Sequence, residues 1–361
     1  MARKLLVSVL FILSLLWLGQ AGVSAQDSSQ DKGITISPVR FEFDIKPGET
    51  KTNTIKLINS TSTDKTIYLY MRNFISDGVS GTPLFITEQL PFTASLKDWI
   101  TLSSSEILVK KVEPDNSNIT QLTFTVTVPA NAEPGGHYAG IIATLVKPGE
   151  TIDAGEGKIA FKDERAAIIL INVEGEVSRS LSVDKFYATD NFTREKPMQR
   201  VFEWMPVGFL TELRNTGNSH TVPVGNIIIY NGDSKIAELD FNPGEGNVLR
   251  ESSRQFFNTW SGALLELVPV LDEKGNQVVD DKGNITSRFS FNFQNMRLPI
   301  GRFNAKLAAG YDDNNDKKTF ISEFEFWVIP WKLLLVIFLL LAAFFYFKFV
   351  RKGKKKQHPQ Q

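Results

Sequence analysis

Gln121–Val128 reads QLTFTVTV, a run in which polar and apolar residues alternate throughout. The apolar residues share one face of an extended strand, and they are Leu122, Phe124, Val126 and Val128. Pro129 follows and ends the run. Thr54–Ile58 and Thr66–Met71 alternate in the same way on either side of a turn-rich segment. Such alternation places one face of each strand in a core and the other in solvent, which is typical of antiparallel sandwiches.

Two other segments are apolar almost throughout and suit inner strands of the same architecture, Tyr138–Val146 and Ala166–Val173. The strand pattern thins over Glu174–Ser182 and then resumes. We therefore predict an all-β chain with two antiparallel β-sandwich domains, residues 33–179 and 180–325. Strands of the second domain are predicted at Phe209–Leu213, Gly225–Tyr230 and Phe303–Leu307.

The two ends of the chain predict export and membrane anchoring. Residues 1–25 have the layout of a signal peptide, because Arg3 and Lys4 precede an apolar run and Val23-Ser24-Ala25 offers small residues for cleavage. Residues 327–350 are predicted as a transmembrane helix, since they are apolar apart from isolated lysines and long enough to cross roughly 30 Å of hydrocarbon. A basic tail follows at 351–361, with Arg351, Lys352, Lys354, Lys355 and Lys356. By the positive-inside rule the tail is cytoplasmic, so we expect a single-pass type I protein of the cell membrane with most of its chain extracellular.

Composition narrows the classes of function. The chain has no cysteine, which excludes disulfides and thiol chemistry and favours a bacterial envelope. All 40 acidic residues lie between 26 and 325, whereas nine of the 40 basic residues lie outside that range. The exported part therefore carries 31 basic and 40 acidic residues, a formal charge of −9 (31 − 40). Binding to nucleic acid is disfavoured, because it requires a basic face.

Signatures of catalysis are missing from the sequence. The three histidines, His137, His220 and His358, are far apart, and no Gly-x-Ser-x-Gly, P-loop or His-Glu-x-x-His motif occurs. Plentiful carboxylates leave a glycosidase pair as an alternative. Asp312–Asp316 is rich in oxygen ligands, but it lacks the glycine and glutamate of a calcium loop and is interpreted as a hairpin tip. We predict a protein that is not an enzyme and binds no cofactor or metal.

Aromatic residues supply the candidate binding sites. Trp99 is interpreted as part of a core strand within Leu96–Leu102. Trp204 lies outside the clean alternation and is the better candidate for an exposed ring that stacks on a sugar or docks a partner. The candidate binding residues are Trp204, Phe202, Met205, Phe209 and His220. Trp327, Trp331 and Lys332 are assigned to the membrane anchor, the tryptophans as interfacial aromatics.

Several short motifs resemble known families. ISPVR at 36–40, KPGET at 46–50 and Leu57-Ile58-Asn59 resemble the first strands of PapD-like and Ig-like sandwiches. VPANAEPGGHY at 128–138 is similar to a signature of the WxL-interacting proteins of Gram-positive cell surfaces. NTGNSHTVPVG at 215–225 and Gly301-Arg302-Phe303 are similar to the second domain of that family. The resemblance implies peptidoglycan binding by the first domain and host-surface binding by the second. The chain departs from the family at 193–205 and 261–291.

Three hypotheses of function follow. The first is a membrane-anchored adaptor or adhesin of the bacterial cell surface, which binds peptidoglycan or another surface protein. The second is a PapD-like chaperone or assembly module, which adds a partner strand to an exposed edge within Ile34–Phe43. The third is an accessory subunit of a membrane complex that contacts its partners through the anchor.

Overall fold

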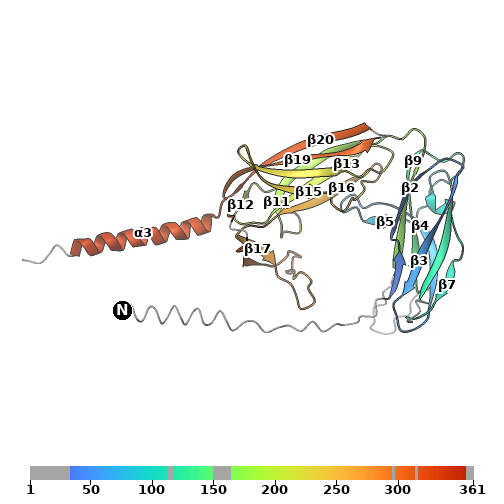
Figure 1. Ribbon diagram of the computed structural model, residues 1–361, viewed down its shortest axis with the longest axis horizontal. Coiled ribbons are helices and arrows are strands. Elements are labelled where there is room, and N and C mark those ends of the chain that lie inside the picture. Colours follow the sequence, from blue (N-terminus) through green and yellow to red (C-terminus); the bar gives the residue numbers. More distant parts are fainter. Residues whose placement is uncertain (1–32, 113–117, 149–163, 295–296, 314–315, 355–361) are drawn as a thin grey trace, which may run out of the picture.

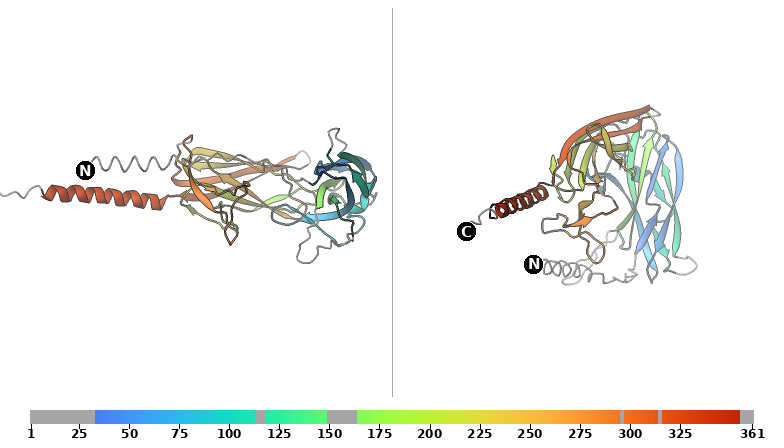
Figure 2. Two further views of the ribbon diagram at one scale, coloured as in Figure 1. Left: turned by 90° about the horizontal axis from the view of Figure 1, so that it is seen from below. Right: turned by 60° about the vertical axis from the view of Figure 1, so that its left-hand side comes forward.

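The computed structural model describes residues 33–112, 118–148, 164–294, 297–313 and 316–354. Two bodies built of strands lie at an angle to each other, and one long helix leaves the second body at the end away from the first (Figure 1). The view from below shows the same order of helix, second body and first body (Figure 2). The predicted signal peptide and the last residues of the basic tail, including Lys355 and Lys356, lie outside the described residues.

The first body is a sandwich of two sheets. One sheet has the order β1-β3-β8-β6, with bounds Ile34–Ser37, Thr50–Asn59, Ile119–Thr127 and Ile100–Leu102. The other has the order β2-β10-β9-β4-β5, with bounds Arg40–Ile45, Glu164–Val173, Gly135–Thr144, Lys65–Ser76 and Pro83–Phe85. A further strand, β7 (Glu106–Val109), pairs with β4. All pairs are antiparallel except β2 with β10, which is parallel.

The core of this first sandwich follows the predicted alternation. Leu122, Phe124, Val126 and Val128 of the QLTFTVTV run are each no more than 1% exposed. They pack with Ile55 and Leu57 of β3 and with Ile141 and Ile169 of the facing sheet. Tyr138–Val146 and Ala166–Val173 largely coincide with β9 and β10, which are neighbours inside the sheet. The predicted inner strands are therefore confirmed.

Leu96–Leu102 differs from its predicted strand. Leu96–Trp99 forms one helical turn, α2, and only Ile100–Leu102 is extended, as β6. Polar groups near the turn stabilise it, since Asn73 Oδ1 accepts the backbone N–H of Lys97 at 2.8 Å and Ser95 O accepts that of Asp98 at 3.0 Å. Trp99 is nevertheless a core residue, and its Nε1 donates to Phe92 O at 2.6 Å.

The second body is also a sandwich. One sheet has the order β11-β13-β16, with bounds Leu181–Asp190, Val207–Asn215 and Ser253–Trp260. The other has the order β12-β20-β19-β14-β15, with bounds Val201–Phe202, Asp316–Val328, Gly301–Asp313, Val224–Asn231 and Ser234–Phe241. The fold class is thus confirmed as two β-sandwiches. The last strand of the first is β10 and the first strand of the second is β11, so the change of body falls between Val173 and Leu181.

Phenylalanine rings fill the second core. Phe326 lies at its centre, with ring centroids 5.6 Å from Phe209, 5.7 Å from Phe303 and 5.8 Å from Phe202. Trp260 closes one side, 6.1 Å from Phe326. Because rings at these distances exclude water and interlock, this cluster fixes the two sheets face to face.

The departure at 261–291 forms a small hairpin beside the second sandwich. Strand β17 (Leu265–Pro269) pairs with β18 (Ser287–Phe291), and two successive tight turns join them. In these turns Asp272 Oδ1 accepts the N–H of Asn276 and Asp280 Oδ1 accepts that of Asn284, both at 2.8 Å. Gly275 and Gly283 have φ of +82° and +78°, so glycine supplies a left-handed residue in each turn.

Helix α3 (Trp331–Lys354) is the one helix among the described residues that is long and apolar enough to cross a membrane. It begins later than the predicted residue 327, because Trp327 and Val328 pair with Val201 and Phe202 as the end of β20. Only Ile329 and Pro330 separate strand from helix. Arg351, Lys352 and Lys354 fall in the last turn of the helix.

Truncation of Phe209 should weaken the second sandwich strongly. Phe209 is fully buried, so we expect Phe209→Ala to lower the free energy of unfolding by about 3–5 kcal/mol. Ile321→Ala is the matched control, because Ile321 is 62% exposed and its loss should change stability by about 0.5 kcal/mol or less. Urea unfolding of the two variants measures both values, and equal effects would contradict this assignment of the core.

Candidate functional site

At the junction of the two sandwiches, the backbone of β9 lies close to the backbone of the loop after β13. Gly136 N donates to Asn218 O at 2.8 Å, which joins β9 to the loop after β13. Gly135 has a φ of +108°, and a Cβ built on it would lie 2.3 Å from Asn218 O. A side chain at this position would therefore separate the sandwiches. The motif EPGGHY thus has a structural task, which is to let the second body approach the first.

An apolar cluster and polar contacts complete the junction. Leu249 of the second sandwich packs with Phe74, Tyr138 and Leu170 of the first. Beside it, the Tyr138 hydroxyl accepts the backbone N–H of Arg250 at 3.2 Å, and burial raises the pKa of Tyr138. Strand β9 is buried along its full length, with one face on its own core and with Gly136 and Tyr138 at the second sandwich.

Glu42 on β2 is the polar centre of the junction. Its carboxylate receives hydrogen bonds from His220 Nε2 at 3.2 Å and from Asn247 Nδ2 at 3.1 Å, both in the second sandwich, and from the neighbouring Arg40. Partial burial alone would raise the pKa of Glu42, but the hydrogen bonds from His220 and Arg40 outweigh it and lower the pKa to about 2. A second polar link lies nearby, where Ser219 Oγ donates to Asn172 Oδ1 at 3.0 Å.

Two cavities flank the junction. One of about 430 Å³ lies between Phe74, His137 and Tyr138 on one side and Leu249 and Arg250 on the other. The second has a volume of about 550 Å³ and is more polar. Its lining comes from the outer side of β2 and from the second sandwich, and includes Glu42, Phe43, Asp44, Arg179, His220 and Asn247.

Strand β2, which borders this second cavity, is the edge of its sheet. Within the described residues β2 pairs only with β10. Strand β1 is likewise the edge of the opposite sheet, where it pairs only with β3 of the described strands. The bonds Ile168 N to Val39 O at 2.9 Å and Glu174 N to Ile45 O at 3.0 Å set the ladder to β10. Because alternate residues of a strand bond to one neighbour, the backbone groups of Arg40, Glu42 and Asp44 point away from β10.

The predicted binding residues do not form one surface. Phe202, Met205 and Phe209 are at most 4% exposed and belong to the second core, so these three side chains are not at the surface for the predicted binding role. Their burial could not be predicted from the sequence. It depends on β12 pairing with β20, which lies more than 100 residues away, and no local pattern indicates that contact. Trp204 is half-buried with its ring 5.2 Å from Phe289.

His220 lies apart from that group, at the junction. It is 8% exposed, and its ring stands 5.6 Å from Tyr138. Its Nδ1 has no hydrogen-bond partner among the described residues. His137 also reaches the junction region, and its ring nitrogens lie 3.1 Å from Ala94 O and 2.8 Å from Glu133 O. The fold thus brings His137 and His220, which are far apart in the sequence, to the same junction.

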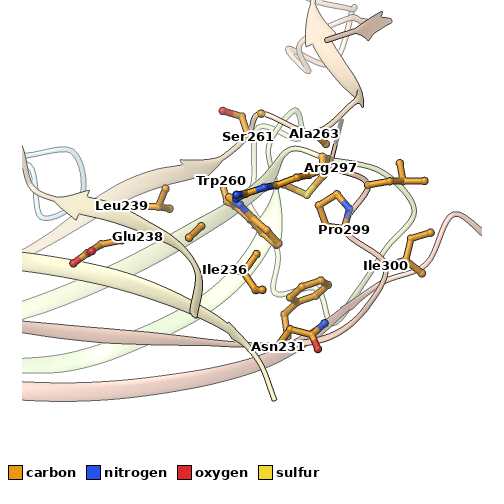
Figure 3. A pocket seen from close by; sticks show the side chains of 15 residues that line it. Asn231, Ile236, Glu238, Leu239, Trp260, Ser261, Ala263, Arg297, Pro299 and Ile300 are labelled. Atoms are coloured by element: carbon orange, nitrogen blue, oxygen red, sulfur yellow. The ribbon is translucent and has the colours of Figure 1, made fainter. Parts of the chain in front are cut away.

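A third cavity, of about 590 Å³, lies at the other end of the second sandwich. Figure 3 shows Ile236, Trp260 and Pro299 around it, with Glu238 and Arg297 among the polar lining residues. No cluster of three or more metal-ligating side chains occurs in the part of the chain that the structure describes. Asp312, Asp313 and Asp316 lie at the β19–β20 hairpin tip, whose residues 314–315 lie outside the described part.

No family model and no curated protein matches the chain. Solved structures similar to it include CfaA, a chaperone of class 5 fimbriae, with 11% identity, 81% of this chain and 99% of that chain covered, and a TM-score of 0.36. The Pseudomonas aeruginosa CupB2 chaperone has 8% identity, 80% and 100% coverage and a TM-score of 0.31. A PapD-like domain of human CEP192 has 15% identity, 42% and 92% coverage and a TM-score of 0.25. Membership of the WxL-interacting family stays a prediction.

The junction should open when Glu42 is neutralised. The pKa of Glu42 is lowered from 4.5 to about 2, so its stabilising contribution is complete above pH 4.5 and is lost as the pH falls towards 2. Spin labels on Leu108→Cys and Ile321→Cys, which are exposed sites on the two sandwiches of a cysteine-free chain, report the distance between them. For the chain with native Glu42 we expect a broader distance distribution at low pH than at neutral pH. Glu42→Gln should show the broader distribution already at neutral pH, whereas the control Glu106→Gln should not. An unchanged distribution in Glu42→Gln would contradict the assigned role.

Proposed function

We propose that this chain is a non-enzymatic, membrane-anchored binding protein of the bacterial cell envelope, which captures an extended segment of another protein as an additional strand along β2. The observation that carries the proposal is the outer edge of β2, which no strand of the described residues pairs and which lies beside the polar junction cavity. The proposal joins the predicted adaptor role to the predicted use of an exposed edge within Ile34–Phe43.

Backbone chemistry supplies the binding energy. An edge strand offers a row of N–H and C=O groups, and an extended peptide that satisfies them gains affinity with little dependence on its sequence. On β2 the groups of Arg40, Glu42 and Asp44 point outward. The partly exposed rings of Phe41 and Phe43 lie on the core side of the same strand.

The junction cavity supplies selectivity. A strand laid along β2 would run beside about 550 Å³ of space lined by both sandwiches. The carboxylates of Glu42 and Asp44, which line this space, would contact side chains that alternate along the added strand. The charges on β2 also disfavour indiscriminate pairing with other edges, including the edge of a second copy.

The anchor sets where capture takes place. Helix α3 leaves the second sandwich at the end away from the first, so the β2 edge is held at a distance from the proposed membrane (Figure 1). In this proposal the sandwiches face outward and the basic tail stays in the cytoplasm. Peptidoglycan, the other predicted ligand, is an outcome of the test below.

Asp44→Pro should abolish capture and Asp44→Ala should retain it. Proline removes the outward N–H at this position and leaves the ladder to β10 intact, whereas alanine removes only the side chain. We would measure retention of envelope proteins and of purified peptidoglycan by the full-length chain and both variants. Equal retention of the protein partner by both variants would refute strand addition. Retention of peptidoglycan that neither variant changes would instead favour a wall-binding adaptor.

A further inference from the structure

The end of the second sandwich from which α3 leaves carries a group of exposed apolar side chains. We call this group the anchor-end patch, and its members are Phe289, Phe291, Phe293, Leu298, Ile300, Trp327 and Trp331. Their exposed fractions range from 41% for Leu298 to 76% for Phe293. Large apolar groups gathered at one place on a surface mark a site of interaction, unlike single ones scattered over it.

Pairing and packing hold the members of the patch together although they come from three segments. Phe291 on β18 pairs with Leu265 on β17, and Leu265 shares a small cavity with Leu298 and Pro330. Gly301, directly after Ile300, pairs with Val328 beside Trp327. Figure 1 shows β17 beside β12, at the end of the second sandwich that gives rise to α3. The hairpin therefore places its phenylalanines next to the start of the helix.

The helix is fixed to this end of the sandwich. Ile329 N donates to Phe202 O at 2.8 Å, so the backbone stays bonded up to the residue before Pro330. In the first turn of α3, Lys332 Nζ lies 2.7 Å from Glu203 Oε2. The first contact fixes the point at which α3 begins, and the second links the first turn of α3 to the sandwich. The patch consequently keeps one position relative to the point at which α3 begins.

We propose that the anchor-end patch inserts its aromatic side chains into the interfacial layer of the bilayer that α3 crosses, so that the second sandwich rests on the membrane. The inference rests on the anchoring part of the proposed function. Lipid is the occupant that the surroundings favour, because the apolar span of α3 is not buried against the described protein and Trp331, the first residue of α3, belongs to the patch. Tryptophan is enriched in the layer between headgroups and chains, and phenylalanine on the apolar face of an interfacial segment is buried at the same boundary.

Membrane docking would also explain the role of the hairpin at 261–291, where the chain departs from the resembling family. Strands β17 and β18 of the hairpin pair with each other, and β17 meets the second sandwich at one bridge, where Leu267 N donates to Met205 O at 2.8 Å. No residue of β17 or β18 is fully buried. The contribution of the hairpin to the second core is therefore small. The hairpin and the residues after it instead place Phe289, Phe291 and Phe293 at the anchor end. The rings of Phe291 and Phe293 are stacked, with their centroids 6.0 Å apart.

Because the chain has no cysteine, a single introduced cysteine can carry a label that reports how deeply its position lies in the membrane. Single variants Phe293→Cys, Phe92→Cys and Ile337→Cys of the full-length chain would carry a nitroxide label, with one chain per lipid nanodisc. Phe92 is the matched control, since it is 58% exposed on the first sandwich, and Ile337 lies within the apolar span of α3. Collision of each label with oxygen, which concentrates in lipid, is compared with collision with a water-soluble nickel chelate.

The expected ratio of oxygen to nickel accessibility is several-fold higher at position 293 than at 92, and highest at 337. Equal ratios at 293 and 92, with a high ratio at 337, would overturn the docking and leave the anchor intact. A low ratio at 337 would overturn the anchor and the docking together. Shielding of 293 that appears only with two or more chains per nanodisc would assign the patch to a second copy and also overturn the proposal. Capture along β2 plays no part in these measurements.

Discussion

Strand β9 is buried on both faces, and the arrangement of the molecule depends on how that burial is achieved. One face completes the first core through residues such as Ile141. The other would expose Tyr138 to solvent if the second sandwich were absent, so the apolar contact with Leu249 favours one placement of the two bodies. The glycine pair at 135–136 permits the approach, and Glu42 adds polar contacts that must be satisfied together. Interlocking of apolar and polar contacts of this kind specifies one geometry.

How much of this could be predicted depended on the range of the interactions concerned. The alternation in Gln121–Val128 reports burial directly, because neighbouring side chains of a strand point to opposite faces, and the core residues followed from it. The turns at Asp272 and Asp280 were equally local, since each is closed by bonds within four residues. These features were readable from the chain alone.

The candidate site was much harder to predict, because it is built from distant segments. His220 meets Glu42 across 178 residues, and no spacing in the sequence reports that meeting. Phe202 and Met205 appeared irregular because β12 is only two residues long, yet both are core residues. The patch at the anchor end was missed for a related reason. Phe289 and Phe291 lie in the segment 261–291, for which the sequence gives no pattern that predicts a surface.

The direct passage from β20 into α3 has a mechanical consequence. A pull on a polypeptide held along β2 would pass through the parallel ladder to β10, across the junction, and along the β19–β20 ladder to the helix. In both ladders the two strands are paired over many residues. Tension along the strands is therefore shared among several hydrogen bonds at once. With only Ile329 and Pro330 between strand and helix, no slack segment absorbs the force. Tension applied to the sandwiches would therefore reach the start of α3 with little loss.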